Sequence, residues 1–154
     1  MKKITLLLSL YILVSSCGVK QTQNLLNSGN YDQAIENAIS NLRTNKDKKG
    51  KQEYVFLLEE AFAKAKERDL NAINILTKEA NAAQLEKMYT TYIQLNDRQE
   101  KIKPILPLKL IKEGRNAIFP FDNYNDQIVD SKNVLSAYLY ANAKKLLIEK
   151  AKKK

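Results

Sequence analysis

A single thiol is the most reactive side chain of this 154-residue chain, and no imidazole accompanies it. Cys17 is the only cysteine, so the sequence offers no disulfide and no thiolate cluster for a metal ion. The absence of histidine excludes a Ser-His-Asp triad, a Cys-His dyad and nearly every catalytic zinc site. We therefore expect Cys17 to be modified, and we expect the protein to be no enzyme and to hold no metal.

Carboxylates are the remaining candidates for chemistry. Glu59 and Glu60 could serve a glycosidase-like mechanism, which needs two carboxyl groups at a set separation. Asp122, Asp126 and Asp130 could suggest a cation site, but Gln127 stands where a calcium loop needs its Gly. We expect the glutamates to be solvated and the aspartates to favour the start of a helix, whose N-terminal dipole attracts negative charge.

The residues before Cys17 have the pattern of a cleaved export signal. Lys2 and Lys3 precede an apolar run of 11 residues, Ile4–Val14. As a helix this run would be about 16 Å long, too short for a bilayer core of about 30 Å. A basic start, a short apolar run and small residues after it are typical of a secretory signal peptide. An ordinary signal peptide with a chance cysteine near its end is the alternative.

The four residues Val14-Ser15-Ser16-Cys17 resemble the lipobox of bacterial lipoproteins. The resemblance implies that the thiol of Cys17 takes a diacylglyceryl group, that cleavage removes residues 1–16, and that the new α-amine receives a further acyl chain. Two or more acyl chains anchor a protein firmly, at about 0.8 kcal/mol per buried CH₂ group. The covalent lipid on Cys17 would then be the anchor, and no separate cofactor is expected.

The residues after Cys17 bear on location and domain organisation. Gly18 is not the Asp that retains bacterial lipoproteins at the inner membrane, and no acidic run follows it. We therefore expect a lipid-anchored protein of the cell envelope, at the periplasmic face of the outer membrane. Residues 17–23 would form the acylated Cys and a short polar linker, and residues 24–154 a single helical domain.

A helical hairpin is predicted over residues 25–42. Gly29 allows a turn with positive φ, and an apolar stripe at helical spacing follows it: Tyr31, Ala34, Ile35, Ala38 and Leu42. The pattern Leu25-Leu26-x-x-Gly29-Asn30-Tyr31-x-x-Ala34-Ile35 resembles the middle of a tetratricopeptide repeat. The resemblance implies that Gly29 makes the turn, Tyr31 fills the hairpin and Ala34 lets the helices approach. A generic amphipathic hairpin is the alternative.

Longer helices follow this hairpin. One is predicted from about Gln52 to Lys78 or Glu79, with an apolar stripe of Tyr54, Leu57, Leu58, Ala61, Phe62 and Ala65. The phase slips at Arg68-Asp69-Leu70, and Leu70, Ile73, Leu76 and Ala80 resume the stripe; a bend would explain the slip better than a break. The next runs from Gln84 to Arg98, with an inward face of Leu85, Met88, Tyr89, Tyr92 and Leu95. The last runs from about Asn125 to Lys152, with an apolar face of Ile128, Leu135, Tyr138, Leu139, Leu146 and Leu147.

An irregular segment from Pro104 to Tyr124, which we call the strap, should precede the last helix. Pro104 and Pro107 interrupt the helical run, and Phe119-Pro120-Phe121 would either plug the core or form a surface patch. Ile118 and Phe119 could pair as a short strand but have no obvious partner. The expected fold is therefore all-α: antiparallel helical hairpins, a tetratricopeptide-like α-solenoid fragment, with a strap containing Pro and Phe.

The last helix also resembles a repeat. Ala137–Ile148 is similar to the first helix of another tetratricopeptide hairpin, but Lys-rich sequence follows it. Either this is a polar capping helix, as solenoids need at their ends, or the chain is a shortened relative of a longer repeat lipoprotein.

The net charge adds a second functional reading. The chain carries 26 Lys and Arg against 17 Asp and Glu, and removal of Lys2 and Lys3 lowers the net charge from +9 to +7. Six lysines near the end could contact an anionic surface: Lys144, Lys145, Lys150, Lys152, Lys153 and Lys154. Nucleic acid is not expected, because an exported protein seldom meets it.

Two functions remain open from the sequence. The leading one is a membrane-anchored, non-enzymatic scaffold that binds an envelope protein or peptide, because stacked helix pairs offer extended grooves. The alternative is an envelope-surface protein that binds anionic lipid or glycan through its basic C-terminal helix.

Overall fold

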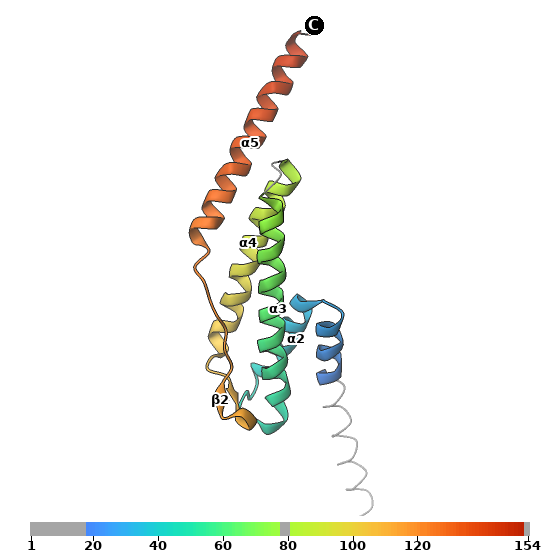
Figure 1. Ribbon diagram of the computed structural model, residues 1–154, viewed down its shortest axis with the longest axis vertical. Coiled ribbons are helices and arrows are strands. Elements are labelled where there is room, and N and C mark those ends of the chain that lie inside the picture. The colour runs from blue at the N-terminus through green and yellow to red at the C-terminus, as the bar shows by residue number, and fades with distance from the viewer. Residues whose placement is uncertain (1–17, 78–80, 153–154) are drawn as a thin grey trace, which may run out of the picture. The chain divides into compact units, whose positions relative to one another are not determined.

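Helices dominate the computed structural model, which describes residues 18–77 and 81–152 (Figure 1). The contacts of the chain group it into two compact units, and the domain bounds expected from the sequence stay a prediction. Unit 1 comprises Met1–Ala65 and Glu100–Pro120, and unit 2 comprises Lys66–Gln99 and Phe121–Lys154. The all-α class expected from the sequence is confirmed.

Unit 1 begins with the predicted hairpin. Its first helix covers residues 18–27 and its second is α2, Tyr31–Leu42. The first helix ends in a Schellman motif: Asn30 N donates to Leu25 O at 2.9 Å and Gly29 N to Leu26 O at 3.2 Å. Gly29 has a φ of 79°, which only glycine adopts without strain.

The first helix differs from the sequence-based expectation. Residues 18–23, expected as a polar linker, are helical. Thr22 is fully buried, and its hydroxyl, which has one proton to donate, lies 3.0 Å from Gly18 O and 3.1 Å from Asn37 Oδ1. A polar side chain with a hydrogen-bond acceptor in reach can occupy an interior position, so the polar composition of this segment did not reveal its burial.

The rest of unit 1 surrounds the first half of α3, Gln52–Leu76. The elements around it include the end of α4, Ala82–Ile102, and a series of short elements: η1 Lys49–Lys51, η2 Lys103–Ile105, β1 Lys109–Leu110, η3 Ile111–Glu113 and β2 Arg115–Asn116. The core is aliphatic and aromatic, as predicted for the stripes of both helices: Ile35, Ala38, Leu42, Tyr54, Leu57, Leu58, Ala61, Phe62 and Ala65 are all buried.

The strap contains a small antiparallel hairpin. Lys109 pairs with Asn116 and Leu110 with Arg115. Gly114, with a φ of 65°, lies in the connection between the two strands. The strand considered from the sequence at Ile118 and Phe119 does not form: Ile118 is exposed, and Phe119 packs edge-on against Phe62 with ring centroids 5.6 Å apart.

Unit 2 contains the rest of α3, most of α4, and α5, Asn125–Lys152. Its core is Ile73, Leu95 and Tyr124, against which Met88, Tyr92 and Ile128 pack. A capping box starts α4, because Gln84 N donates to Asn81 Oδ1 at 3.0 Å and Asn81 N donates to Gln84 Oε1 at 3.3 Å.

The slip in the phase of α3 has a simple explanation. The helix runs without interruption through Arg68-Asp69-Leu70. Leu70, expected inside, is exposed, whereas Asp69 is buried four residues after Ala65 and four before Ile73. The buried stripe is therefore regular, and a charged residue occupies one of its positions.

The apolar face of α5 is the largest departure from expectation. Its bounds agree with the prediction, and Ile128, Leu135 and Tyr138 are partly buried. Leu139, Leu146 and Leu147, expected to face inward, are exposed. Within the described ranges, no helix is long and apolar enough to cross a membrane.

Candidate functional site

The lipidation residues proposed from the sequence lie outside the described part of the chain. Val14, Ser15, Ser16 and Cys17 precede residue 18, and Lys153 and Lys154 follow residue 152. Acylation of Cys17 therefore stays a prediction.

The residues that resemble a repeat turn lie together in the N-terminal hairpin. Gly29 forms the turn, Tyr31 is half-buried at the first position of α2, and Ala34 is completely buried. A side chain larger than a methyl group at position 34 would therefore enter the packed interior of unit 1.

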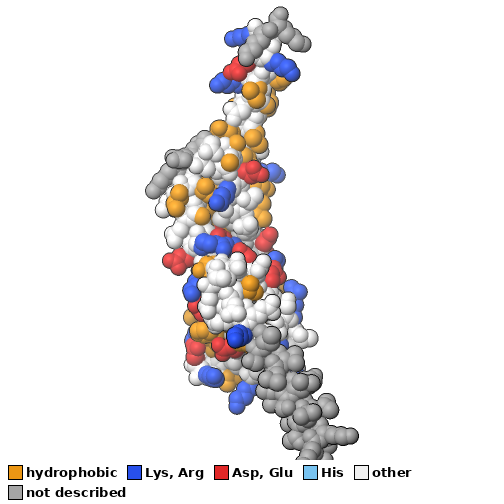
Figure 2. Space-filling view, turned by 90° about the vertical axis from the view of Figure 1, so that its right-hand side faces the viewer, with side chains coloured by type: hydrophobic (Ala, Val, Ile, Leu, Met, Phe, Trp, Pro, Cys, Tyr) orange, Lys and Arg blue, Asp and Glu red, His pale blue; other side chains and the backbone are white. Residues whose placement is uncertain are grey.

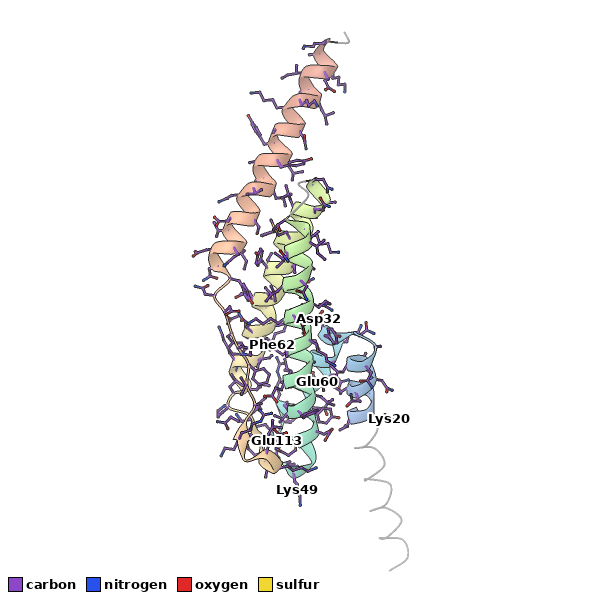
Figure 3. The ribbon with its side chains drawn as sticks, in the orientation of Figure 1. Lys20, Asp32, Lys49, Glu60, Phe62 and Glu113 are labelled. Atoms are coloured by element: carbon purple, nitrogen blue, oxygen red, sulfur yellow. The ribbon has the colours of Figure 1, made fainter. Side chains whose placement is uncertain are left out.

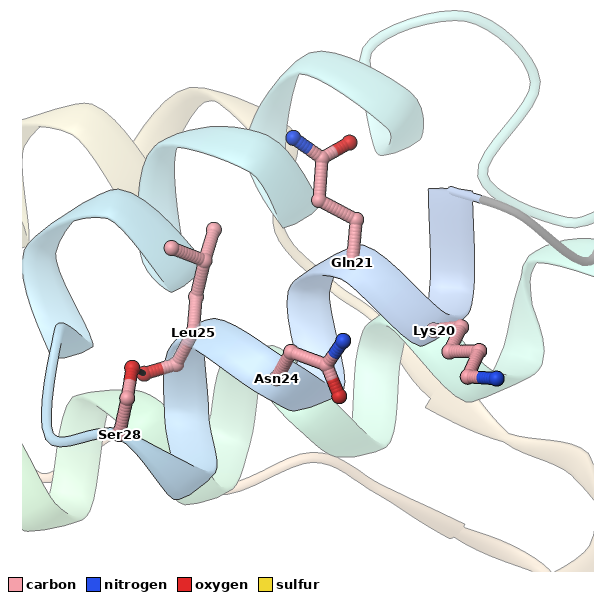
Figure 4. Close-up of a pocket in the computed structure, with 5 residues that line it drawn as sticks. All are labelled: Lys20, Gln21, Asn24, Leu25 and Ser28. Carbon is pink, nitrogen blue, oxygen red and sulfur yellow. Dashed lines mark hydrogen bonds between the residues drawn. The ribbon is translucent and has the colours of Figure 1, made fainter.

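The surface of this hairpin has two shallow hollows. The first, of about 410 Å³, lies along the helix at 18–27 and is bordered by Lys20, Gln21, Asn24, Leu25 and Ser28 (Figure 4). The second, of about 540 Å³, shares Gln21 and Leu25 and is otherwise bordered by polar side chains of α2: Asp32, Gln33, Glu36, Asn37, Ser40 and Asn41. The polar side chains of this lining can hydrogen-bond a peptide backbone.

Several polar groups of the second hollow are already engaged. Glu36 forms an ion pair with Lys101. Asn41 Nδ2 donates to Asn37 O at 3.0 Å, and Lys51 Nζ donates to Asn41 Oδ1 at 3.1 Å. These bonds reduce the number of amides that a ligand could use.

Glu59 accepts hydrogen bonds from two residues of the strap, Arg115 and Ile118. Arg115 Nη1 lies 2.6 Å from its Oε1 and Nη2 lies 2.9 Å from its Oε2, while Ile118 N donates to Oε1 at 2.6 Å. The hydrogen bond from Arg115 lowers the pKa of Glu59, with a smaller contribution from the amide of Ile118. A glycosidase acid needs a raised pKa, so the electrostatics of Glu59 are opposite to that role. Glu60 pairs with Lys64 at 2.7 Å.

Asp122 is also tied to neighbouring groups. Lys66 Nζ lies 2.6 Å from its carboxylate, and the hydroxyl of Tyr124 donates to it at 3.1 Å. Lys66 lowers the pKa of Asp122, while burial, followed by the hydrogen bond to Asp122, raises the pKa of Tyr124 to about 12. Asp126 lies in the first turn of α5 and Asp130 one turn later. Among the described residues, no group of three or more acidic, His or Cys side chains could hold a metal ion.

An ion pair inside unit 2 escaped the sequence analysis. The side chains of Asp69 and Arg98 are 7% and 6% exposed, and Arg98 Nη2 contacts Asp69 Oδ2. Arg68 Nε contacts the other carboxylate oxygen at 2.8 Å. The phase slip at Leu70 was the only signal in the sequence that an unusual residue occupies the buried stripe.

Among the described residues, most of the exposed large hydrophobic side chains lie on α5. Leu139, Tyr140, Ala143, Leu146 and Leu147 follow one another at i, i+1, i+4, i+7 and i+8, which places them on one side of the helix. We call this set the α5 stripe. Its four large side chains are 50%, 72%, 65% and 70% exposed in that order, and Ala143 is exposed as well. The space-filling view shows such hydrophobic side chains beside lysines on α5 (Figure 2).

The lysines singled out from the sequence lie on several sides of α5. Lys144, Lys145, Lys150 and Lys152 are exposed, and Glu149 is the only acidic residue of the helix after Asp130. The structure thus combines on one helix the two features that the sequence suggested separately, an apolar face and a basic end. Comparison of the chain with models of protein families, with curated proteins and with solved structures found no match.

Proposed function

We propose that the protein is a lipid-anchored scaffold of the cell envelope that binds a partner protein through the α5 stripe and catalyses no reaction. The observation that carries this proposal is the exposure of four large apolar side chains on one side of a helix. A contiguous apolar patch of this kind is typical of a docking surface. Anchoring by acyl chains on Cys17 would keep the stripe at the membrane where the partner resides.

The charge of α5 indicates the chemistry of the partner. Of the four exposed lysines on its last turns, Lys144 and Lys150 lie at helical positions next to the stripe, and Lys145 and Lys152 lie on the opposite side. An amphipathic helix with an apolar face and acidic flanks would complement both features, as in helix-in-groove recognition. Burial of a leucine side chain contributes about 1.5–3 kcal/mol, so loss of Leu146 or Leu147 should weaken binding at least about tenfold.

Site-specific photo-crosslinking in living cells tests this surface. A photoreactive amino acid at Tyr140 or Leu147 should give one discrete adduct with an envelope protein, and Leu146→Asp should abolish it. The matched control is Gln94, an exposed position of α4 in the same unit. Adducts of equal yield from Gln94, or none from either stripe position, would refute the proposal. An adduct of twice the chain's own mass would identify a second copy as the occupant instead.

The anchor needs its own test. Labelling with radioactive palmitate should mark the wild-type chain and not the Cys17→Ala variant. Unlabelled wild type, or undiminished label on the variant, would exclude lipidation at this residue.

The alternative function, contact of α5 with anionic lipid or glycan, is favoured by the same exposed lysines. Electrostatic binding weakens as salt rises, because the Debye length falls from about 10 Å at 0.1 M to about 3 Å at 1 M. Binding to anionic vesicles that is lost in the variant Lys144→Gln/Lys145→Gln/Lys150→Gln would support this alternative. Retention of the crosslinked protein adduct in that variant would favour the scaffold.

A further inference from the structure

We propose that one end of unit 1, where the helix at residues 18–27 begins, is the surface that faces an anionic lipid bilayer. We call it the basic pole and define it by Lys48, Lys49, Lys109, Lys112 and Ile111. The inference rests on the proposed acylation of Cys17 and extends it, because it assigns the orientation in which the anchored unit sits on the membrane.

Gly18 lies at the same end of α3 as the basic pole. A Cβ atom added to Gly18 would overlap the hydroxyl of Tyr54, so the residue after the acylated Cys lies against the start of α3. Lys51 Nζ lies 5.2 Å from the centroid of the Tyr54 ring. Gln52 Oε1 accepts a hydrogen bond from Ile111 N at 2.7 Å. Gly18 and the tip of the strap therefore both lie against the first turn of α3.

The exposed side chains around this point are mostly basic. Lys48, Lys49, Lys109 and Lys112 are all exposed, and Ile111, between the last two, is 58% exposed. Lys49 and Glu113 lie at the same end of unit 1 as the beginning of the first helix (Figure 3). Two acids, Glu53 and Glu113, line the same hollow as Lys112, and Glu113 pairs with Arg115 at 2.7 Å. The pole therefore presents lysines around an apolar tip.

This arrangement matches the chemistry of a bilayer surface. Lysines are attracted to anionic headgroups within a Debye length, and an apolar side chain can enter the interface beside them. The acyl chains would be attached one residue before Gly18, so no linker would separate the pole from the headgroups. The lysines would then orient unit 1, while the acyl chains provide the attachment.

Depth-dependent fluorescence quenching of the intact acylated protein tests this orientation. Acylation consumes the only native thiol, so Lys49→Cys and Ser28→Cys each provide one position for a fluorophore. Ser28 is exposed and lies ten residues after Gly18, about 15 Å along the helix. In vesicles of phosphatidylglycerol and phosphatidylcholine with a headgroup nitroxide, we expect quenching at position 49 to exceed that at position 28 at least about twofold, because of this separation.

Two charge-matched variants show whether the pole is responsible. Lys48→Gln/Lys109→Gln/Lys112→Gln should remove the difference between the two reporters, as should 1 M salt. Lys144→Gln/Lys145→Gln/Lys150→Gln, which removes the same charge from α5, should preserve it. Equal quenching at positions 49 and 28, or an equal effect of the two variants, would overturn the inference.

Failure of the anchor would give a different result. The parent chain should not react with maleimide after denaturation, because its thiol carries the lipid. A reactive thiol in the parent chain would refute acylation and with it the proposed membrane attachment. An unreactive parent whose two reporters are equally quenched would refute the basic pole alone.

Discussion

Replacing Asp69 with Leu should destabilise unit 2 by about 3–5 kcal/mol, because the buried guanidinium of Arg98 loses its carboxylate. The pair is nearly inaccessible to water, with side chains 7% and 6% exposed. Desolvation of a charge is costly when its counter-charge is absent. A loss of this size is a large fraction of the 5–15 kcal/mol that typically separates folded from unfolded protein.

The loss of stability should be large only when one of the two buried partners, Asp69 or Arg98, is removed. Arg98→Met should cost a similar amount, because it leaves Asp69 buried beside Arg68 alone. Arg68→Gln is the control: its side chain is 41% exposed, and a pair with an exposed partner is worth about 0–1 kcal/mol. The double variant Asp69→Leu/Arg98→Met should recover to within about 1–2 kcal/mol of the wild type, since apolar residues can replace a buried ion pair.

Urea unfolding followed by circular dichroism measures all four variants. With a slope of about 2 kcal/mol per M, each single core variant should lower the midpoint by about 1.5–2.5 M. The double-mutant cycle then isolates the coupling between the two side chains. The reasoning would be refuted by a double variant whose loss equals the sum of the single losses, or by a loss below about 1 kcal/mol for Asp69→Leu.

Three further perturbations follow from named contacts. The pKa of Glu59 is lowered in the folded chain from an ordinary value of 4.5, so its contribution to stability is complete above that value and is lost as the pH falls through the folded pKa. The urea midpoints of wild type and Glu59→Gln should therefore converge between pH 5 and strongly acidic pH. A difference in midpoint that stays constant over this range would contradict the expectation. In thermal melts, Gly29→Ala should lower the free energy of unfolding by about 1–2 kcal/mol, because φ is positive at this residue. The control Gly50→Ala, whose new Cβ meets no atom within 4 Å, should leave the melting temperature unchanged. Gln99→Leu should cost about 1–3 kcal/mol, because the backbone N–H and C=O of Asp122 lose bonds of 2.7 and 2.9 Å; a melting temperature equal to that of wild type would exclude this role.

Periodicity predicted the regular elements well. The stripe of α2 and the first stripe of α3 are buried as expected, and α5 begins and ends at the predicted residues. Local signals suffice for these features, because an apolar residue every three to four positions defines both the helix and its inner face. The Schellman turn at Gly29 likewise depends on one residue type at one place.

Long-range partners could not be predicted in the same way. Asp69 occupies a buried position because Arg98 lies 29 residues later in sequence and beside it in space. Thr22 can be buried because Gly18 O and Asn37 Oδ1 both lie within hydrogen-bond distance of its hydroxyl. The strands of the strap are two residues long, too short for a pattern of alternation to be read.

The exposed face of α5 shows another limit of sequence patterns. Leu139, Leu146 and Leu147 define an apolar face in the sequence, and the same residues form most of the α5 stripe. Amphipathicity specifies which side of a helix can be buried, but not what covers it. The sequence therefore predicted the apolar face of α5, but it did not show that this face is exposed and could bind a partner.

The strap has a consequence for hydrogen exchange. Its backbone amides at Ile111, Ile118 and Asp122 are bonded to side chains, namely those of Gln52, Glu59 and Gln99, at 2.6–2.7 Å. These amides should exchange with solvent slowly although they lie outside any extended ladder, and each should be released by one substitution in a helix that stays intact. Protonation of Glu59 would speed the exchange of the Ile118 amide and leave the amides of Ile111 and Asp122 protected. The exchange rate of each of these three amides would thus show whether its own hydrogen bond to a helix side chain is intact.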